Sequence, residues 1–153
     1  PYTREASIPR RTETLASQAQ ASVSIPYGGY GLNDQFEPRN SADKSMQFHN
    51  WWQCFGTEEW AQYEWDQPMT LTEASVYWLE LGHYDIDFQL PVSCRLEYKA
   101  GEKWLPVKNT DPYEIAKDKY CTVHFQPVRT KALRLTAQLQ EGKSAGILEW
   151  KVR

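Results

Sequence analysis

The chain has 153 residues, a length suited to one domain with a buried core. Its 17 Lys and Arg against 20 Asp and Glu give a formal net charge of −3, which offers no cationic field for nucleic acid. No apolar run approaches the length that crosses a bilayer, so neither nucleic acid nor a membrane is an expected partner. Seven Trp and nine Tyr supply side chains that serve both cores and binding surfaces.

The start of the chain differs in character from the remainder. Residues 1–14 are polar, contain two prolines and show no sustained periodicity. We interpret them as a linker or N-terminal extension and residues 15–153 as a single module. Small and β-branched residues at 15–25 predict a first strand, which ends at Pro26 and a Gly-Gly turn.

Turn signals divide the rest of the chain into further short strands. Residues 60–65 alternate in a way that places Ala61, Tyr63 and Trp65 on one face. Residues 66–68 then predict a turn. Further strands are expected at 70–81, 93–99, 103–108, 119–128, 131–139 and 145–152.

The overall pattern contains neither a sustained helical stripe nor a β-α-β alternation. We therefore predict an all-β fold of seven or eight short strands, an antiparallel β-sandwich or jelly roll. The first and last strands are expected to pair, which would bring the two ends of the module together.

Two loop clusters suit a sugar, which needs an aromatic face for its C–H side and polar side chains for its hydroxyls. Trp51 and Trp52 are neighbours and would point to opposite faces of a strand, so we expect only one of them to face a ligand. The predicted ligand-binding residues are His49, Asn50, Trp52, His83 and Tyr84.

Several segments, taken in order and spacing, point to a known family. They are Trp60-Ala61-Gln62-Tyr63-Glu64-Trp65, Ala74-Ser75-Val76-Tyr77-Trp78, Arg95-Leu96-Glu97-Tyr98-Lys99, Phe125-Gln126-Pro127-Val128-Arg129 and Gly146-Ile147-Leu148-Glu149-Trp150. Together they resemble the discoidin, or coagulation-factor type C, domain of the galactose-binding-like superfamily, which includes carbohydrate-binding module family 32. The resemblance covers nearly everything after about Thr14, and it implies an eight-stranded jelly roll.

The resemblance also implies a structural Ca²⁺ beneath the ligand-binding loops. Family members commonly take ligands from an Asp in an Asp-Gly pair, a Ser or Thr soon after it, and a Glu in the last strand. Here Asp34 matches the Asp although Gln35 replaces the Gly, Asp43 or Ser45 could fill the later position, and Glu149 matches the Glu. These are the hard oxygen ligands that Ca²⁺ prefers. The alternative is that Asp34 and Asp43 simply stabilise turns through hydrogen bonds to the backbone.

The resemblance implies a non-catalytic carbohydrate-binding module of a larger bacterial glycoside hydrolase. We expect it to be secreted or periplasmic, monomeric, and joined to a catalytic glycosidase domain of the same chain. The alternative is an accessory domain that packs on the catalytic domain without a ligand of its own. A binding module should expose Trp52 or Tyr84 beside polar groups, whereas an accessory domain should bury them. Paired carboxylates such as Asp85 and Asp87 would suit a glycosidase, but acidic residues in loops are usually turn formers.

Overall fold

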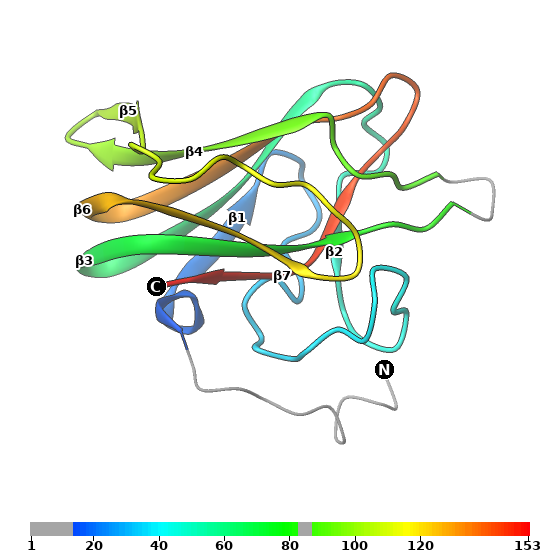
Figure 1. Ribbon diagram of the computed structural model, residues 1–153, viewed down its shortest axis with the longest axis horizontal. Helices are drawn as coiled ribbons and strands as arrows, with labels where there is room; N and C mark the ends of the chain where they lie inside the picture. The colour runs from blue at the N-terminus through cyan, green and yellow to red at the C-terminus, as the bar shows by residue number, and fades with distance from the viewer. Residues whose placement is uncertain (1–13, 83–86) are drawn as a thin grey trace.

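The computed structural model describes residues 14–82 and 87–153. Within these ranges the chain is almost entirely β-structure, with one short 3-10 helix, η2, at Leu15–Gln18. All strand pairings are antiparallel, which confirms the predicted fold class (Figure 1). The strands are β1 (Gln20–Val23), β2 (His49–Asn50), β3 (Glu58–Leu79), β4 (Ser93–Ala100), β5 (Lys103–Pro106), β6 (Tyr120–Gln138) and β7 (Gly146–Val152).

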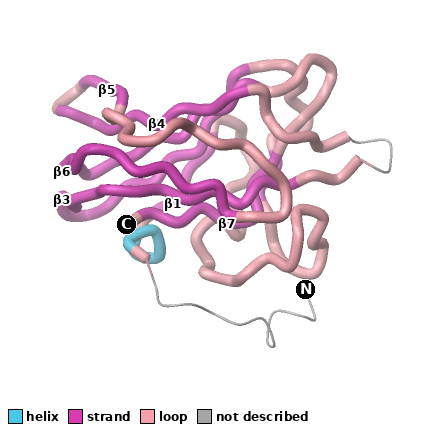
Figure 2. Tube along the Cα trace, in the orientation of Figure 1, coloured by secondary structure: helices cyan, strands magenta, loops and turns pink. Residues whose placement is uncertain are grey.

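The two longest strands, β3 and β6, take part in both layers of the sandwich. They pair with each other along most of their length, with a register shift between Glu64 and Met69. Before the shift β3 also pairs with β1, and after it β3 pairs with β7. The second half of β6 pairs with β4. One hydrogen-bonded sheet, in the order β2-β7-β3-β6-β4-β5, therefore folds over on itself to make two layers (Figure 2).

The fold-over explains why the predicted turn at residues 66–68 is wrong. These residues form a bend inside β3, where the strand passes from one layer to the other. Asp66 and Gln67 are exposed at this bend, and Pro68 lacks the N–H that a regular ladder would use. Similarly, the two strands expected at 119–128 and 131–139 are one strand, β6.

Two expectations about the first strand also need correction. Residues Leu15–Gln18 form the 3-10 helix η2, so strand β1 begins only at Gln20. Strand β1 pairs with β3, whereas the last strand, β7, pairs with β2 and β3; the first and last strands do not pair. The C-terminus still lies beside η2 (Figure 1). Apart from Thr14, the predicted linker falls outside the described residues.

Aromatic side chains join the two layers in the core. The three residues predicted to share one face of residues 60–65, Ala61, Tyr63 and Trp65, are all buried. The Tyr63 ring stacks on Trp150 of β7, with ring centroids 4.0 Å apart. The Tyr63 hydroxyl also donates a hydrogen bond of 2.8 Å to the backbone carbonyl of Trp150. This contact fixes one layer against the other.

Long loops gather at the end of the sandwich away from the bend of β3 and β6 (Figure 2). The segment between β1 and β2 is the longest of them, and strand β2 attaches its end to β7 through the pairs His49–Ile147 and Asn50–Gly146. In the described ranges, no helix has the length and apolar character needed to span a bilayer. Because binding residues often lie on loops held by a rigid scaffold, a binding site is expected at the loop end of the sandwich.

Candidate functional site

A cleft of about 450 Å³ lies between the loop after β1 and the segment around β2. Three aromatic side chains at this cleft are strongly exposed: Tyr27 at 82%, Tyr30 at 66% and Trp52 at 44% of their surface. Large exposed aromatic residues gathered around one hollow are typical of a binding surface. The complete lining is Tyr27, Gly28, Tyr30, Phe48, Asn50, Trp52 and Gln53.

The Trp51-Trp52 pair divides between core and cleft, although both residues follow the end of β2 and do not lie in a strand. Trp51 is fully buried, and its indole N–H donates to the backbone carbonyl of Trp60 over 3.3 Å. Trp52 is exposed at the cleft, and its backbone N–H donates to the side-chain Oδ1 of Asn50 over 3.1 Å. Asn50 thus helps to fix the backbone that presents Trp52.

The prediction that His49 contacts a ligand is wrong, because its side chain is fully buried. Its Nδ1 accepts the backbone N–H of Gly29 over 2.9 Å, and its ring lies edge-on to Trp51 with centroids 4.7 Å apart. A Cβ on Gly28, whose φ is +131°, would come within 2.5 Å of that Nδ1. The ring therefore supports the glycine turn that carries Tyr27 and Tyr30, and it positions the cleft without lining it.

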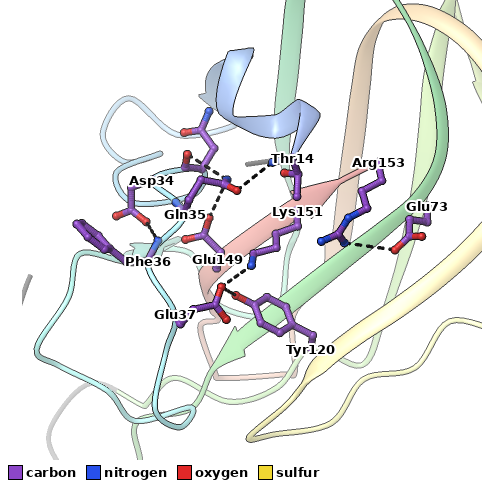
Figure 3. A network of polar contacts seen from close by, with 11 residues as sticks. Thr14, Asp34, Gln35, Phe36, Glu37, Glu73, Tyr120, Glu149, Lys151 and Arg153 are labelled. Atoms are coloured by element: carbon purple, nitrogen blue, oxygen red, sulfur yellow. Dashed lines mark hydrogen bonds and ion pairs between the residues drawn. The ribbon is translucent and has the colours of Figure 1, made fainter. Parts of the chain in front are cut away.

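A pair of carboxyl groups, Asp34 and Glu149, lies where the segment between β1 and β2 meets strand β7. Glu149 on β7 is fully buried, and its Oε2 accepts the backbone N–H of Gln35 over 3.0 Å. Its Oε1 has no hydrogen-bond partner among the described residues. Burial and the neighbouring carboxyl of Asp34 hold the pKa of Glu149 well above its usual range. Asp34 in turn accepts the backbone N–H of Phe36 over 3.1 Å (Figure 3).

Gln35 occupies the position where the family resemblance expects Gly. Its φ is +68°, the left-handed conformation that Gly adopts most easily. The backbone shape of an Asp-Gly turn is therefore retained. The added side chain is buried: its Oε1 accepts the Thr14 N–H over 3.2 Å, and its Nε2 lies 3.5 Å from the Glu149 Oε2 (Figure 3).

The structure places Asp43 and Ser45 in a second polar cluster, with Arg39. The Arg39 Nη2 donates to the Asp43 Oδ1 over 3.1 Å, and the Ser45 N–H donates to the same oxygen over 3.0 Å. Although burial opposes it, these hydrogen bonds hold the pKa of Asp43 well below its usual range. Asp43 therefore stabilises its own loop, as the alternative interpretation expected.

Comparisons with known proteins identify the fold. No family model matches the chain, and no curated protein matches it. Among solved structures, the β-galactosidase BgaA of Streptococcus pneumoniae is similar, at 18% identity and a TM-score of 0.71 over 95% of this chain and 96% of the other. A chitosan-binding module of a chitosanase/glucanase from Paenibacillus sp. IK-5 matches with 13% identity and a TM-score of 0.56. The match covers 92% of this chain and 98% of the module. The module CpGH89CBM32-5 of Clostridium perfringens was solved with GalNAc-β-1,3-galactose. It matches with 10% identity and a TM-score of 0.62, and the match covers 92% of this chain and 99% of the module.

This chain therefore has the same fold as these solved structures. Its loop end carries the aromatic cleft, and its acidic pair lies where the segment between β1 and β2 meets strand β7. Five residues that line the cleft were not predicted as site residues: Tyr27, Gly28, Tyr30, Phe48 and Gln53. A signal for the two tyrosines was present, since they flank a Gly-Gly pair in the sequence, but that segment was interpreted only as a turn. The predicted His83 and Tyr84 lie outside the described residues.

The acidic pair could supply two of the oxygen ligands that a hard cation needs. Half-buried Asp34 lies beside buried Glu149, and the Oε1 of Glu149 receives no N–H or O–H donor in the described part of the chain. In residues 14–82 and 87–153, no group of three or more His, Cys, Asp or Glu side chains is placed to hold a metal. A Ca²⁺ bound here would therefore need further oxygens from backbone carbonyls or hydroxyls, as is common for this ion.

Buried His49 should make the domain sensitive to acid. Burial lowers its pKa to about 3, against about 6.5 in an unfolded chain. Below pH 6.5 the unfolded state takes up a proton that the native ring does not, so stability present above that pH is lost as the pH falls. We expect a contribution of about 2 to 3 kcal/mol to disappear between pH 6.5 and 4.5.

Urea denaturation at both pH values, in the wild type and in His49→Gln, measures this effect. The variant should lose less stability on acidification than the wild type. His124→Gln is the control, because His124 is exposed and its pKa is raised by Asp111, which gives a pH dependence of opposite sign. Equal acid losses in the wild type and His49→Gln would show that His49 is not the group responsible.

Proposed function

We propose that this chain is a galactose-binding-like domain and a non-catalytic carbohydrate-binding module that holds glycan in the aromatic cleft. The observation that carries the proposal is the exposure of Trp52, Tyr27 and Tyr30 around one cleft, with the amides of Asn50 and Gln53 beside them. Aromatic faces suit the apolar C–H side of a pyranose, and amides can donate to and accept from its hydroxyls. The arrangement is thus complementary to a sugar ring.

The structural neighbours support the same class of function. One is a chitosan-binding module, another was solved with a GalNAc-galactose disaccharide, and a third comes from a β-galactosidase. By analogy we propose that the domain belongs to a larger bacterial glycoside hydrolase that acts outside the cytoplasm. Its partners would be a glycan and the catalytic domain of its own chain.

The exposure of Trp52 also favours a binding module over an accessory domain. A domain that only packs on its neighbour would have Trp52 buried and its apolar patch elsewhere. Screening the wild-type domain on a glycan array and by affinity electrophoresis tests the proposal. Binding to at least one glycan is expected. Retention on none of them would contradict the proposal and favour the accessory role.

We further propose that Asp34 and Glu149 hold a structural Ca²⁺. A cation bound only by the native state must stabilise it, by about 2.7 kcal/mol at a concentration 100 times its dissociation constant. For a domain of this size we therefore expect excess chelator to lower the melting temperature by about 5 to 10 °C. Scanning calorimetry with Ca²⁺ and with chelator measures the shift.

Two variants locate the calcium effect. Glu149→Gln keeps the side-chain size but removes the charge, so its melting temperature should no longer respond to Ca²⁺. Asp43→Asn should still respond, because Asp43 is bound to Arg39 and Ser45 in the second polar cluster. A wild-type melting temperature that chelator leaves unchanged would refute the calcium proposal.

A further inference from the structure

We infer that the aromatic cleft selects uncharged glycans, an inference that rests on the proposed function and narrows its ligand class. Its lining consists of aromatic rings, a glycine and two amides. Among the described residues, no Asp, Glu, Lys, Arg or His side chain lines it. The cleft therefore offers shape, apolar faces and hydrogen bonds, but no countercharge from residues 14–82 or 87–153.

The missing countercharge has an energetic consequence for a charged sugar. A carboxylate or sulfate that enters the cleft gives up part of its hydration, and no Lys or Arg replaces it. The negative face of an aromatic ring adds repulsion. An ammonium group also loses hydration and meets no carboxylate, although the ring of Trp52 offers it some cation–π attraction. Discrimination should therefore be strongest against acidic glycans and weaker against amino sugars.

The two amides suit hydroxyl groups in particular. A hydroxyl both donates and accepts, and the side chains of Asn50 and Gln53 do the same. The Oδ1 of Asn50 already accepts the Trp52 N–H over 3.1 Å, so Asn50 offers a ligand mainly its N–H donors. Such donors match the lone pairs of hydroxyl or N-acetyl oxygens.

The domain does carry clustered charges, but at a different place. A second hollow of about 610 Å³ lies at the bend of β3 and β6, and its lining includes Glu64, Asp66, Lys99, Arg129 and Lys131. The uncharged lining of the aromatic cleft is thus a local property of that site.

The two structural neighbours with named ligands differ in the charge of those ligands, since chitosan is cationic and GalNAc-β-1,3-galactose is neutral. The cleft of this chain fits the neutral class.

A glycan array of matched pairs tests this inference. Each neutral oligosaccharide is printed beside a charged counterpart: sialylated, sulfated or uronic-acid versions, and deacetylated versions of N-acetylated chains. Hits are then measured by isothermal titration calorimetry. We expect the neutral member to bind at least about 10-fold more tightly than its acidic counterpart. A charged member that binds as tightly as its neutral partner, or more tightly, would overturn the inference and leave the proposed function standing. Binding to no glycan at all would refute the proposed function.

A charge placed in the cleft shows whether the selectivity originates there. Gln53→Lys should form a new ion pair with the acidic glycan. The ratio of the dissociation constants of the acidic and the neutral glycan should therefore fall by about 5-fold or more. Gln67→Lys adds the same charge at the exposed bend of β3, outside the cleft lining, and should leave the ratio of the two affinities unchanged. An unchanged ratio in Gln53→Lys would also overturn the inference.

Discussion

Replacing Trp52 by Ala should weaken glycan binding by about 30-fold or more, which corresponds to about 2 kcal/mol. A Trp at the centre of a sugar site provides most of the apolar surface that the ligand covers, and such residues dominate binding energies. Trp52 is the largest side chain in the lining of the cleft, and it remains 44% exposed without a ligand. Titration calorimetry with the best glycan found on the array measures the loss.

Phe55 provides a matched control for this substitution. It lies three residues further along the same segment and is 45% exposed, almost the same fraction as Trp52, but it does not line the cleft. Phe55→Ala should therefore keep the wild-type affinity. Melting curves of both variants show whether the fold is intact. Full affinity in Trp52→Ala, or equal losses in the two variants, would contradict the assignment of the cleft.

Replacing Trp150 by Ala should cost about 3 to 5 kcal/mol of unfolding free energy, a large part of the stability of an ordinary domain. Trp150 is fully buried, and its ring stacks on Tyr63 across the two layers. Removing it leaves a cavity between β7 and β3 that the surrounding strands cannot fill completely. Urea denaturation monitored by circular dichroism measures the change.

The same substitution at Trp104 is the control. Trp104 lies on β5, is only partly buried, and stacks with Arg134 at 4.3 Å. Its loss removes a cation–π contact and some burial, so Trp104→Ala should cost about 1 kcal/mol. If Trp150→Ala is no more damaging than Trp104→Ala, the stacked pair is not the main contact between the layers.

Much of the fold could be predicted because the signals are local. The alternation of residues 60–65 places Tyr63 and Trp65 on the same face, and in the structure both are buried. The number and ends of the strands were harder to predict. Residues 66–68 have the composition of a turn, but the pairing of β3 with β6 continues on both sides of them. Whether a chain turns back or bends depends on which strands it pairs with, and single-segment patterns do not contain that information.

The site was predicted only in part, for a related reason. Strand alternation led us to expect that only one of Trp51 and Trp52 faces a ligand. The structure buries Trp51 and exposes Trp52, but both follow the end of β2. The burial of His49 depends on Gly29, which is 20 residues away. The proximity of Asp34 and Glu149 was suggested only by the family resemblance, and the hydrogen bond from the Gln35 N–H to Glu149, across 114 positions, was not predicted.

The central claim, that the aromatic cleft binds glycan, is tested most directly by nuclear magnetic resonance. The ¹⁵N-labelled domain carries seven Trp indole signals, and each is assigned by substitution. On titration with a neutral oligosaccharide, the indole of Trp52 and the backbone amides of Tyr27, Tyr30 and Asn50 should shift together and saturate at one dissociation constant. Shifts confined to Trp60 and Trp104 on the outer face of the sheet, with the signal of Trp52 unmoved, would contradict the claim.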